Sequence, residues 1–344
     1  MSSEDDDPHW PARESERWTA SSLWRRSRDR AREDKSSWDY VISSGVAGGI
    51  AGCVAKTSIA PLDRVKILFQ TSNADFAKYA GHPMGLIHAI ARIYRTSGVP
   101  GLFQGHLVTL LRIFPYAGIK YMAYDWSEAI LVPTPDKRTP ARFFVAGAFS
   151  GVTSVLLTYP LELIRVRLAY QTQASERTSL VQAVRSIYRE AERRPPGTGT
   201  SSISALTRSI PLYPFYRGFS ISLIGMVPYA GTSFLTYGTL RRHLPDYVPY
   251  LAESATARDL VCGGIAGAVS QTASYPFEVV RRRMQVGGAR GGYGITWRDA
   301  VKSVYETRGM RGFFVGLTIG YLKVVPMTSI AYTTWQMMKR VLEI

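Results

Sequence analysis

The chain has 344 residues, a formal net charge of +16 and a hydrophobic fraction of 46%. So strong a positive charge suits nucleic acid, an anionic membrane or an anionic small molecule. The sequence contains no metal-ligand cluster, Walker loop or nucleophile elbow, so we do not expect an enzyme. Its long uncharged segments argue against nucleic-acid binding. The two cysteines, Cys53 and Cys262, lie in apolar segments, which favours reduced, packed thiols over a disulfide.

Residues 1–36 are acidic at their start and turn basic at Arg25-Arg26-Ser27-Arg28. A transit peptide is poor in acids and a secretory signal has an apolar core, so this segment fits neither. We expect a disordered tail. Its arginine-rich end either contacts a membrane surface or only aids solubility.

A short motif ends the first apolar segment and then occurs twice more. It is a proline, an acid two residues later and a base three residues beyond the acid. The copies are Pro61-Leu62-Asp63-Arg64-Val65-Lys66, Pro160-Leu161-Glu162-Leu163-Ile164-Arg165 and Pro276-Phe277-Glu278-Val279-Val280-Arg281. Glycines stand thirteen and nine residues before each proline. Because five positions agree in three copies, the chain is an internal triplication.

A second element follows each motif. Gly105, Gly218 and Gly316 each stand ten residues before a proline. Each repeat therefore contains two long helical segments, and a short amphipathic helix is expected at 85–95. The long helices are predicted at about 38–70, 107–131, 139–172, 219–244, 255–286 and 317–342. The repeats are placed at 37–134, 135–250 and 251–344, with a flexible Pro/Gly/Ser-rich insert at 193–208.

The long segments have the character of membrane spans. Charge-free runs at 143–161, 218–240 and 260–277 have about the length that crosses a hydrocarbon core. Bases interrupt the other segments, and such groups usually face a water-filled interior. Gly-xxx-Gly pairs favour close packing of helices in lipid, whereas a soluble helical repeat protein would need polar faces that these runs lack. We predict an all-α membrane protein with six transmembrane helices around a central cavity.

The three motifs suggest a ring of ion pairs. An acid and a base three residues apart share one face of a helix. Around a three-fold axis, the acid of one motif would reach the base of the next, which gives Asp63–Arg165, Glu162–Arg281 and Glu278–Lys66. Gln70 and Gln285 would brace this layer by hydrogen bonds, whereas the middle repeat has Ala169 at the matching position. Three ordinary surface salt bridges are the alternative.

These motifs resemble those of the mitochondrial carrier family, whose odd-numbered helices carry Pro-x-[Asp/Glu]-x-x-[Lys/Arg]. The resemblance covers residues 38–342. It implies a monomeric six-helix bundle in the mitochondrial inner membrane, with short matrix-side helices and alternating access. Both termini would face the intermembrane space, and the ion-pair ring would be the matrix gate. The family's sites for cardiolipin, a structural lipid, are matched in part at Tyr216-Arg217-Gly218 and less well at 103–105 and 314–316; no other cofactor is expected.

The family's opposite gate is matched only in part. Its expected charges remain at Asp125, Arg241 and Lys339, whereas Glu128 has the wrong sign and Gln336 stands in place of an acid. The resemblance therefore implies a weak cytoplasmic gate, with one Asp125–Arg241 ion pair and a hydrogen bond from Gln336.

By the same resemblance, substrate contacts lie halfway along the even-numbered helices, at Arg112, Gly225-Met226 and Lys323-Val324. Lys56 and Lys120 would add two further bases to this cavity, and no acid is evident at that depth. Bases so placed favour a polyanion, and a guanidinium suits phosphate. Gly225 would leave a slot for a flat adenine against Met226, although helix packing explains the glycine equally well.

Four longer stretches, 36–40, 60–70, 111–117 and 159–168, resemble the branch of the coenzyme A carriers and the Graves disease carrier. This implies import of coenzyme A, or of a related adenine 3′-phosphate such as adenosine 3′,5′-bisphosphate, by exchange. Two alternatives remain: a carrier that exchanges ATP-Mg or ADP for phosphate, and a membrane adaptor that does not transport. Calcium control is not expected, because no EF-hand loop is present.

Overall fold

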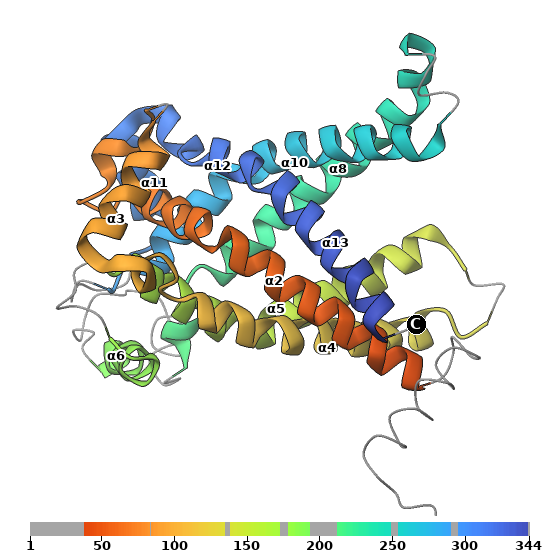
Figure 1. Ribbon diagram of the computed structural model, residues 1–344, viewed down its shortest axis with the longest axis horizontal. Helices are drawn as coiled ribbons and strands as arrows, with labels where there is room; N and C mark the ends of the chain where they lie inside the picture. The colour runs from red at the N-terminus through yellow and green to blue at the C-terminus, as the bar shows by residue number, and fades with distance from the viewer. Residues whose placement is uncertain are drawn as a thin grey trace, which may run out of the picture. The chain divides into compact units, whose positions relative to one another are not determined.

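The computed structural model describes residues 38–82, 84–134, 138–172, 178–192, 212–248, 254–289 and 295–342. The tail at 1–36 and the insert at 193–208 lie outside the described residues. Within the described residues the regular structure is entirely helical, without strands (Figure 1).

The chain divides into two compact units. The described part of the first unit comprises residues 38–51 and 332–342, which are the start of α2 (Trp38–Gln70) and the end of α13 (Val324–Leu342). The second unit, Gly52–Ala331, contains all three motifs and is the one described below.

The long helices match their predicted positions. They are α2 (Trp38–Gln70), α4 (His106–Leu131), α5 (Pro140–Tyr170), α8 (Phe219–Tyr247) and α10 (Ala255–Val286). The sixth predicted helix is divided into α12 (Leu317–Leu322) and α13, with Lys323 between them. The division lies three residues before Pro326, which has no N–H to donate to the carbonyl of Leu322, four residues earlier.

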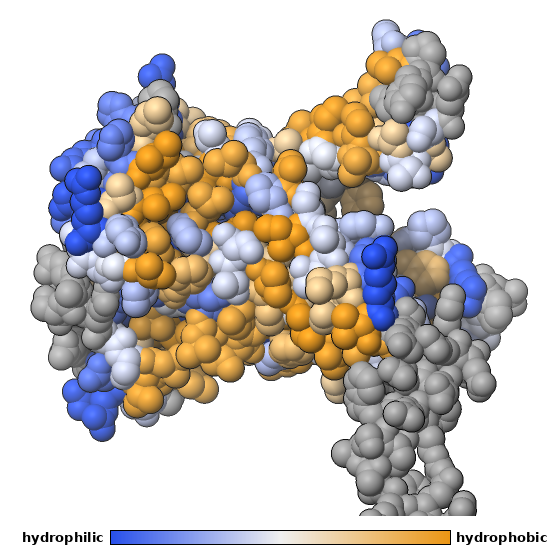
Figure 2. Space-filling view, viewed as in Figure 1, coloured by the Kyte–Doolittle hydropathy of each residue, from blue (hydrophilic) through white to orange (hydrophobic). Residues whose placement is uncertain are grey.

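Shorter helices follow α2, α5 and α10, the first long helix of each repeat. They are η1 (Ala77–Tyr79), α3 (Gly85–Leu102), α6 (Leu180–Glu192), η4 (Tyr213–Tyr216), α11 (Trp297–Arg308) and η5 (Gly309–Phe314). α3 continues beyond the predicted 85–95 across a break at Gly98, where φ is 64°. α6 buries Ala183 and Ile187, and α11 buries Ala300 and Val304. Residues four apart share one helix face, so these helices are amphipathic. Hydrophilic side chains gather around α3, α6 and α11 (Figure 2).

Three apolar clusters join the repeats in cyclic order. Each combines the end of the first long helix of one repeat, the short helix after it and one residue from the second long helix of the preceding repeat. In the first cluster Ile319 packs with the ends of α2 and α3. Val108 of α4 packs with α5 and α6, and Ile221 of α8 packs with α10 and α11. The last repeat thus packs against the first, so the three repeats close on one another at these helix ends.

The second repeated glycine has a clear structural role. Gly105, Gly218 and Gly316 precede α4, α8 and α12 with φ of 81°, 81° and 85°, a region that L side chains rarely adopt. A Cβ there would lie 2.8 Å from the Arg165 carbonyl oxygen, 3.3 Å from that of Arg281 and 3.6 Å from Lys66 Cγ. Each glycine therefore lets an even helix start directly against the motif base of the next repeat.

Four segments in the described part of the chain are long and apolar enough to cross a membrane: Ser43–Gln70, Pro140–Tyr170, Tyr213–Leu244 and Trp297–Leu342. Many large apolar side chains on these helices are exposed, among them Phe144 and Leu235, and orange patches cover much of the visible face (Figure 2). The Gly-xxx-Gly expectation is not met for the second and third pairs in this conformation, because a Cβ at Gly147, Gly151, Gly263 or Gly267 would meet nothing within 4 Å. In the first pair, a Cβ at Gly52 would lie 3.9 Å from Ile113 Cγ2 of α4.

Candidate functional site: an ion-pair layer beside a cavity

The ends of α2, α5 and α10 are joined by the ion pairs expected from the motif spacing. Arg165 Nη2 lies 2.9 Å from Asp63 Oδ2, and Lys66 Nζ lies 2.9 Å from Glu278 Oε1. Arg281 Nη2 is ion-paired with Glu162 Oε1. We call these six residues the motif layer. The action of this layer as a gate remains a prediction.

The acids of the motif layer also bind bases from outside it. Lys323 Nζ lies 2.7 Å from Asp63 Oδ1, and Arg112 Nη1 lies 3.2 Å from Glu162 Oε2. Arg282 Nη1 lies 3.1 Å from Glu162 Oε1. The expectation that no acid neutralises Arg112 and Lys323 was therefore wrong, because these long side chains reach the motif acids. Among the described residues the three motif acids pair with six bases, so the site keeps a positive excess.

Sequence reasoning missed Arg282. It contacts both Glu162 and, at 3.0 Å, the Oε1 atom of Gln285. The run Arg281-Arg282-Arg283 could have indicated it, since only the third motif is followed by two more arginines.

The side chains of the predicted braces, Gln70 and Gln285, donate hydrogen bonds to tyrosine hydroxyls on the helices that carry the motif layer. Gln70 Nε2 donates to the Tyr275 hydroxyl at 3.0 Å, and Gln285 Nε2 donates to that of Tyr159 at 3.1 Å. These hydroxyls donate in turn to the carbonyls of Val315 at 3.0 Å and Arg217 at 2.7 Å. The Gln70–Tyr275 pair therefore joins α2 to α10 and binds the turn before α12. The Gln285–Tyr159 pair joins α10 to α5 and binds the turn before α8. The Tyr-Pro dipeptides of the second and third motifs were the overlooked signal.

The interface between α2 and α5 is different. Alanine replaces both partners there, with Ala60 at the tyrosine position and Ala169 at the glutamine position. Arg64 spans this interface instead: its Nε donates to the Ala169 carbonyl at 3.2 Å and its Nη2 to the Gln171 carbonyl at 2.6 Å. The three helix interfaces of the layer are therefore not equivalent.

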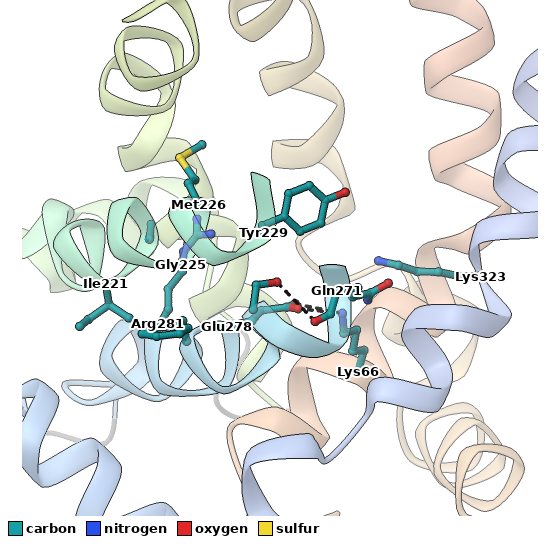
Figure 3. A pocket seen from close by; sticks show the side chains of 12 residues that line it. Lys66, Ile221, Gly225, Met226, Tyr229, Gln271, Glu278, Arg281 and Lys323 are labelled. Carbon is teal, nitrogen blue, oxygen red and sulfur yellow. Dashed lines mark hydrogen bonds and ion pairs between the residues drawn. The ribbon is translucent and has the colours of Figure 1, made fainter. Parts of the chain in front are cut away.

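A cavity of about 360 Å³ lies between α8 and α10, beside the motif layer (Figure 3). Its walls include three of the predicted substrate residues, Gly225, Met226 and Lys323, whereas Arg112, Lys56, Lys120 and Val324 do not line it. The other lining residues are Lys66, Ile221, Ser222, Tyr229, Gln271, Ser274, Phe277, Glu278 and Arg281. The cavity thus has an apolar wall on α8 and a charged floor from the motif layer.

Gly225 permits a close approach of α8 to α10. A Cβ at this position would lie 3.0 Å from Phe277 Cβ. The packing explanation for this glycine therefore applies, and the same approach brings Met226 and Phe277 together in the wall of the cavity.

The remaining predicted bases form no ion pair with the motif acids among the described residues, although Lys56 lies near enough to Asp63 to interact with its charge. Lys56 Nζ contacts Met327 Sδ at 3.5 Å, and Lys120 is exposed. Neither forms a salt bridge within the described ranges. Val324 is exposed at the start of α13.

The expected Asp125–Arg241 pair is not formed in this conformation. Arg241 Nε lies 3.6 Å from Asp259 Oδ1, which also accepts from the Tyr237 hydroxyl at 3.2 Å. Asp125 is exposed and has no ion pair among the residues described. In the other unit, Gln336 Nε2 donates to the Tyr332 hydroxyl at 2.9 Å, and Lys339 lies 4.5 Å from the centre of the Trp335 ring. Asp259 is a further residue that sequence reasoning missed.

Comparison with known proteins adds to this geometry. A family model described as "Mitochondrial carrier protein" matches residues 37–134, 136–248 and 252–344. "Mitochondrial carrier protein LEU5" of Saccharomyces cerevisiae is 41% identical, over 89% of this chain and 92% of its own. "Solute carrier family 25 member 16" of Homo sapiens is 36% identical, over 88% of each chain. "Mitochondrial carrier protein CoAc2" of Zea mays is also 36% identical, over 93% of this chain and 92% of its own.

Proposed function

The chain belongs to the mitochondrial carrier family, and we propose that it carries coenzyme A, or a related adenine 3′-phosphate, into the matrix by exchange. Members of this family are transporters of the mitochondrial inner membrane that cross it several times. The relatives of this chain agree with the predicted branch, that of the coenzyme A carriers and the Graves disease carrier.

One observation carries the proposal: a site with more bases than acids lies beside a largely apolar cavity wall. Arg112 and Lys323 each share a motif acid with another base, Arg281 and Arg165 respectively. A polyanionic substrate can therefore take Arg112 and Lys323 without leaving either acid unpaired. Coenzyme A combines several phosphates with a flat adenine, which suits charges next to an apolar wall.

In the proposed cycle, six transmembrane helices surround the central pathway and the motif layer closes its matrix side. Phosphates of the substrate compete with Asp63 for Lys323 and with Glu162 for Arg112. Each acid keeps another base when its pair with Lys323 or Arg112 is lost, so contacts with the substrate can offset that loss. The layer then separates and the matrix side opens. On the opposite side, Asp125, Arg241, Gln336 and Lys339 form the weaker gate.

The proposal includes the surroundings of the protein. The carrier works as a monomer with both termini in the intermembrane space. Cardiolipin binds at the starts of the even helices, at 216–218, 103–105 and 314–316. The short helices α3, α6 and α11 pack with the ends of the helices that carry the motif layer, so the proposal places them, with that layer, on the matrix side.

A thermal-shift screen tests the substrate. The purified protein, in mild detergent with cardiolipin, is heated with coenzyme A, dephospho-coenzyme A, adenosine 3′,5′-bisphosphate, ATP or citrate. A ligand of the folded state at a hundred times its Kd stabilises that state by about 2.7 kcal/mol. We expect the 3′-phosphorylated compounds to raise the Tm most, with dephospho-coenzyme A much less effective.

The other outcomes separate the alternatives. A larger shift with ATP would support an adenine nucleotide carrier. If no compound shifts the Tm and liposomes show no exchange, the proposal fails and a non-transporting membrane adaptor becomes the better account.

A further inference from the structure

The cavity between α8 and α10 contains an amide that the motif layer does not use. Gln271 lies on α10, five residues before Pro276. Figure 3 shows its side chain next to the Lys66–Glu278 pair, with Lys323 close by and Met226 and Tyr229 on the α8 side. Gln271 was not among the residues predicted from the sequence.

Gly320 of α12 makes room for this amide. A Cβ on Gly320 would clash with Gln271 Nε2 and would lie 3.5 Å from Lys66 Nζ. Gly320 is buried, so any larger residue would displace the Gln271 side chain. The close approach of α12 therefore fixes where the amide stands.

The Gln271 side chain has no hydrogen-bond partner among the described residues. Its backbone carbonyl accepts from Ser274 Oγ at 3.3 Å, and its side chain lines the cavity, with Nε2 on the side of Gly320. A primary amide offers an acceptor and donors side by side. Unlike the bases around it, which are ion-paired, this group is ready to bind a neutral ligand edge that also has one donor and one acceptor.

An adenine presents such an edge. Its 6-amino group donates and its N7 accepts, and a glutamine amide can bind both at once. The apolar wall formed by Met226, Phe277 and the Tyr229 ring suits the flat face of the base. A cavity of about 360 Å³ is near the lower end of the range of about 300–1,000 Å³ for small-molecule sites, so it accepts a base rather than a whole coenzyme A.

We propose that Gln271 determines the base specificity of the carrier. Its amide oxygen accepts from the adenine 6-amino group and its amide nitrogen donates to N7, while the phosphates reach toward Lys323. This inference rests on the proposed transport of an adenine 3′-phosphate. It adds a residue on an odd-numbered helix to the substrate contacts expected on the even-numbered ones.

The test compares adenosine 3′,5′-bisphosphate with inosine 3′,5′-bisphosphate, whose base has a carbonyl in place of the 6-amino group. Dissociation constants are measured for the wild type, for Gln271→Leu and for Gln271→Met. Gln182→Leu is the matched control, since Gln182 is exposed on α6, outside the cavity. Unfolding without ligand checks that each variant is folded, and Gln271→Met keeps an unbranched side chain if leucine is not tolerated.

We expect the wild type and Gln182→Leu to prefer the adenine compound by about tenfold, within the range for a bidentate pair. Both Gln271 variants should bind the two compounds about equally. A folded Gln271 variant that keeps the wild-type preference would overturn the role of this amide, as would a wild type that binds both bases equally. A wild type that binds neither compound would instead refute the proposed substrate, and this inference with it.

Discussion

Glu162 binds three arginines from two helices, while its side chain is only 5% exposed. Substitution of the acid and substitution of one of its bases should therefore have different effects on stability. Removal of one arginine leaves the carboxylate with two partners. Removal of the acid leaves three guanidinium groups close together without a counter-ion.

We expect Glu162→Gln to destabilise the protein by about 3–5 kcal/mol, the cost of breaking a buried ion pair from one side. Arg112→Ala should lower the free energy of unfolding by about 1 kcal/mol or less. It should nevertheless abolish uptake, because Arg112 is a proposed phosphate contact. Thermal unfolding in detergent and uptake into liposomes measure the two effects separately. Equal destabilisation by both substitutions, or normal uptake by a folded Arg112→Ala protein, would contradict this assignment.

The pairs of the motif layer were predictable because repeats and a three-residue spacing define them. The pair between Lys323 and Asp63 was not, because Lys323 lies outside the motifs and the repeat does not match its position with a motif acid. Lys323 stands at the break between α12 and α13. No pattern in the sequence states how far a lysine stem will extend.

At the scale of elements, the sequence placed helices well because glycine and proline mark their ends. The sequence did not predict features that depend on tertiary contacts, such as which helix is divided and which glycines pack closely. Pro115 lies in the unbroken α4, whereas the helix around Pro326 is divided. The Gly-xxx-Gly pairs suggested close packing, but the glycines that bring long helices close to their neighbours include Gly105, Gly225 and Gly320, which lie outside those pairs.

The Tyr–Gln pairs make a prediction about helix ends. Tyr159→Phe leaves Gln285 without its acceptor and the Arg217 carbonyl without its donor, which should cost about 1–3 kcal/mol. Tyr94→Phe on α3, where the side chain is 57% exposed, is the matched control and should change little. Thermal unfolding of the two variants decides the matter: equal Tm values would show that the buried hydroxyl does not stabilise the layer.

At the scale of the whole molecule, the threefold repeat could be predicted from the sequence because one short motif occurs three times. The number of spans is less directly visible. Four segments meet the length and hydropathy of a membrane span, whereas α4 carries Arg112, Lys120, Asp125 and Glu128 and lowers its own average. Charges that turn toward a water-filled interior have this effect on a hydropathy profile, so we retain six spans in the proposal.

The proposed six spans and matrix-side motif layer imply one orientation of the chain. We expect an epitope tag after Ile344 to be digested by protease added to mitochondria with an opened outer membrane. A tag between α10 and α11 should stay protected until the inner membrane is dissolved. The reverse pattern would show that the proposed orientation is wrong.

The alanines at the α2–α5 interface make the three interfaces between α2, α5 and α10 unequal. We call these interfaces the joints of the motif layer. α10 is tied to both neighbours by tyrosine hydroxyls, whereas Ala60 and Ala169 leave α2 and α5 without that bond. Three identical joints would have to yield together, and their costs would add into one high barrier. In the proposed cycle, unequal joints can yield in succession, so that the cost is spread over smaller steps. We expect the α2–α5 interface, which Arg64 holds through backbone carbonyls, and the two interfaces of α10, which the Tyr–Gln pairs hold, to separate at different points of that cycle.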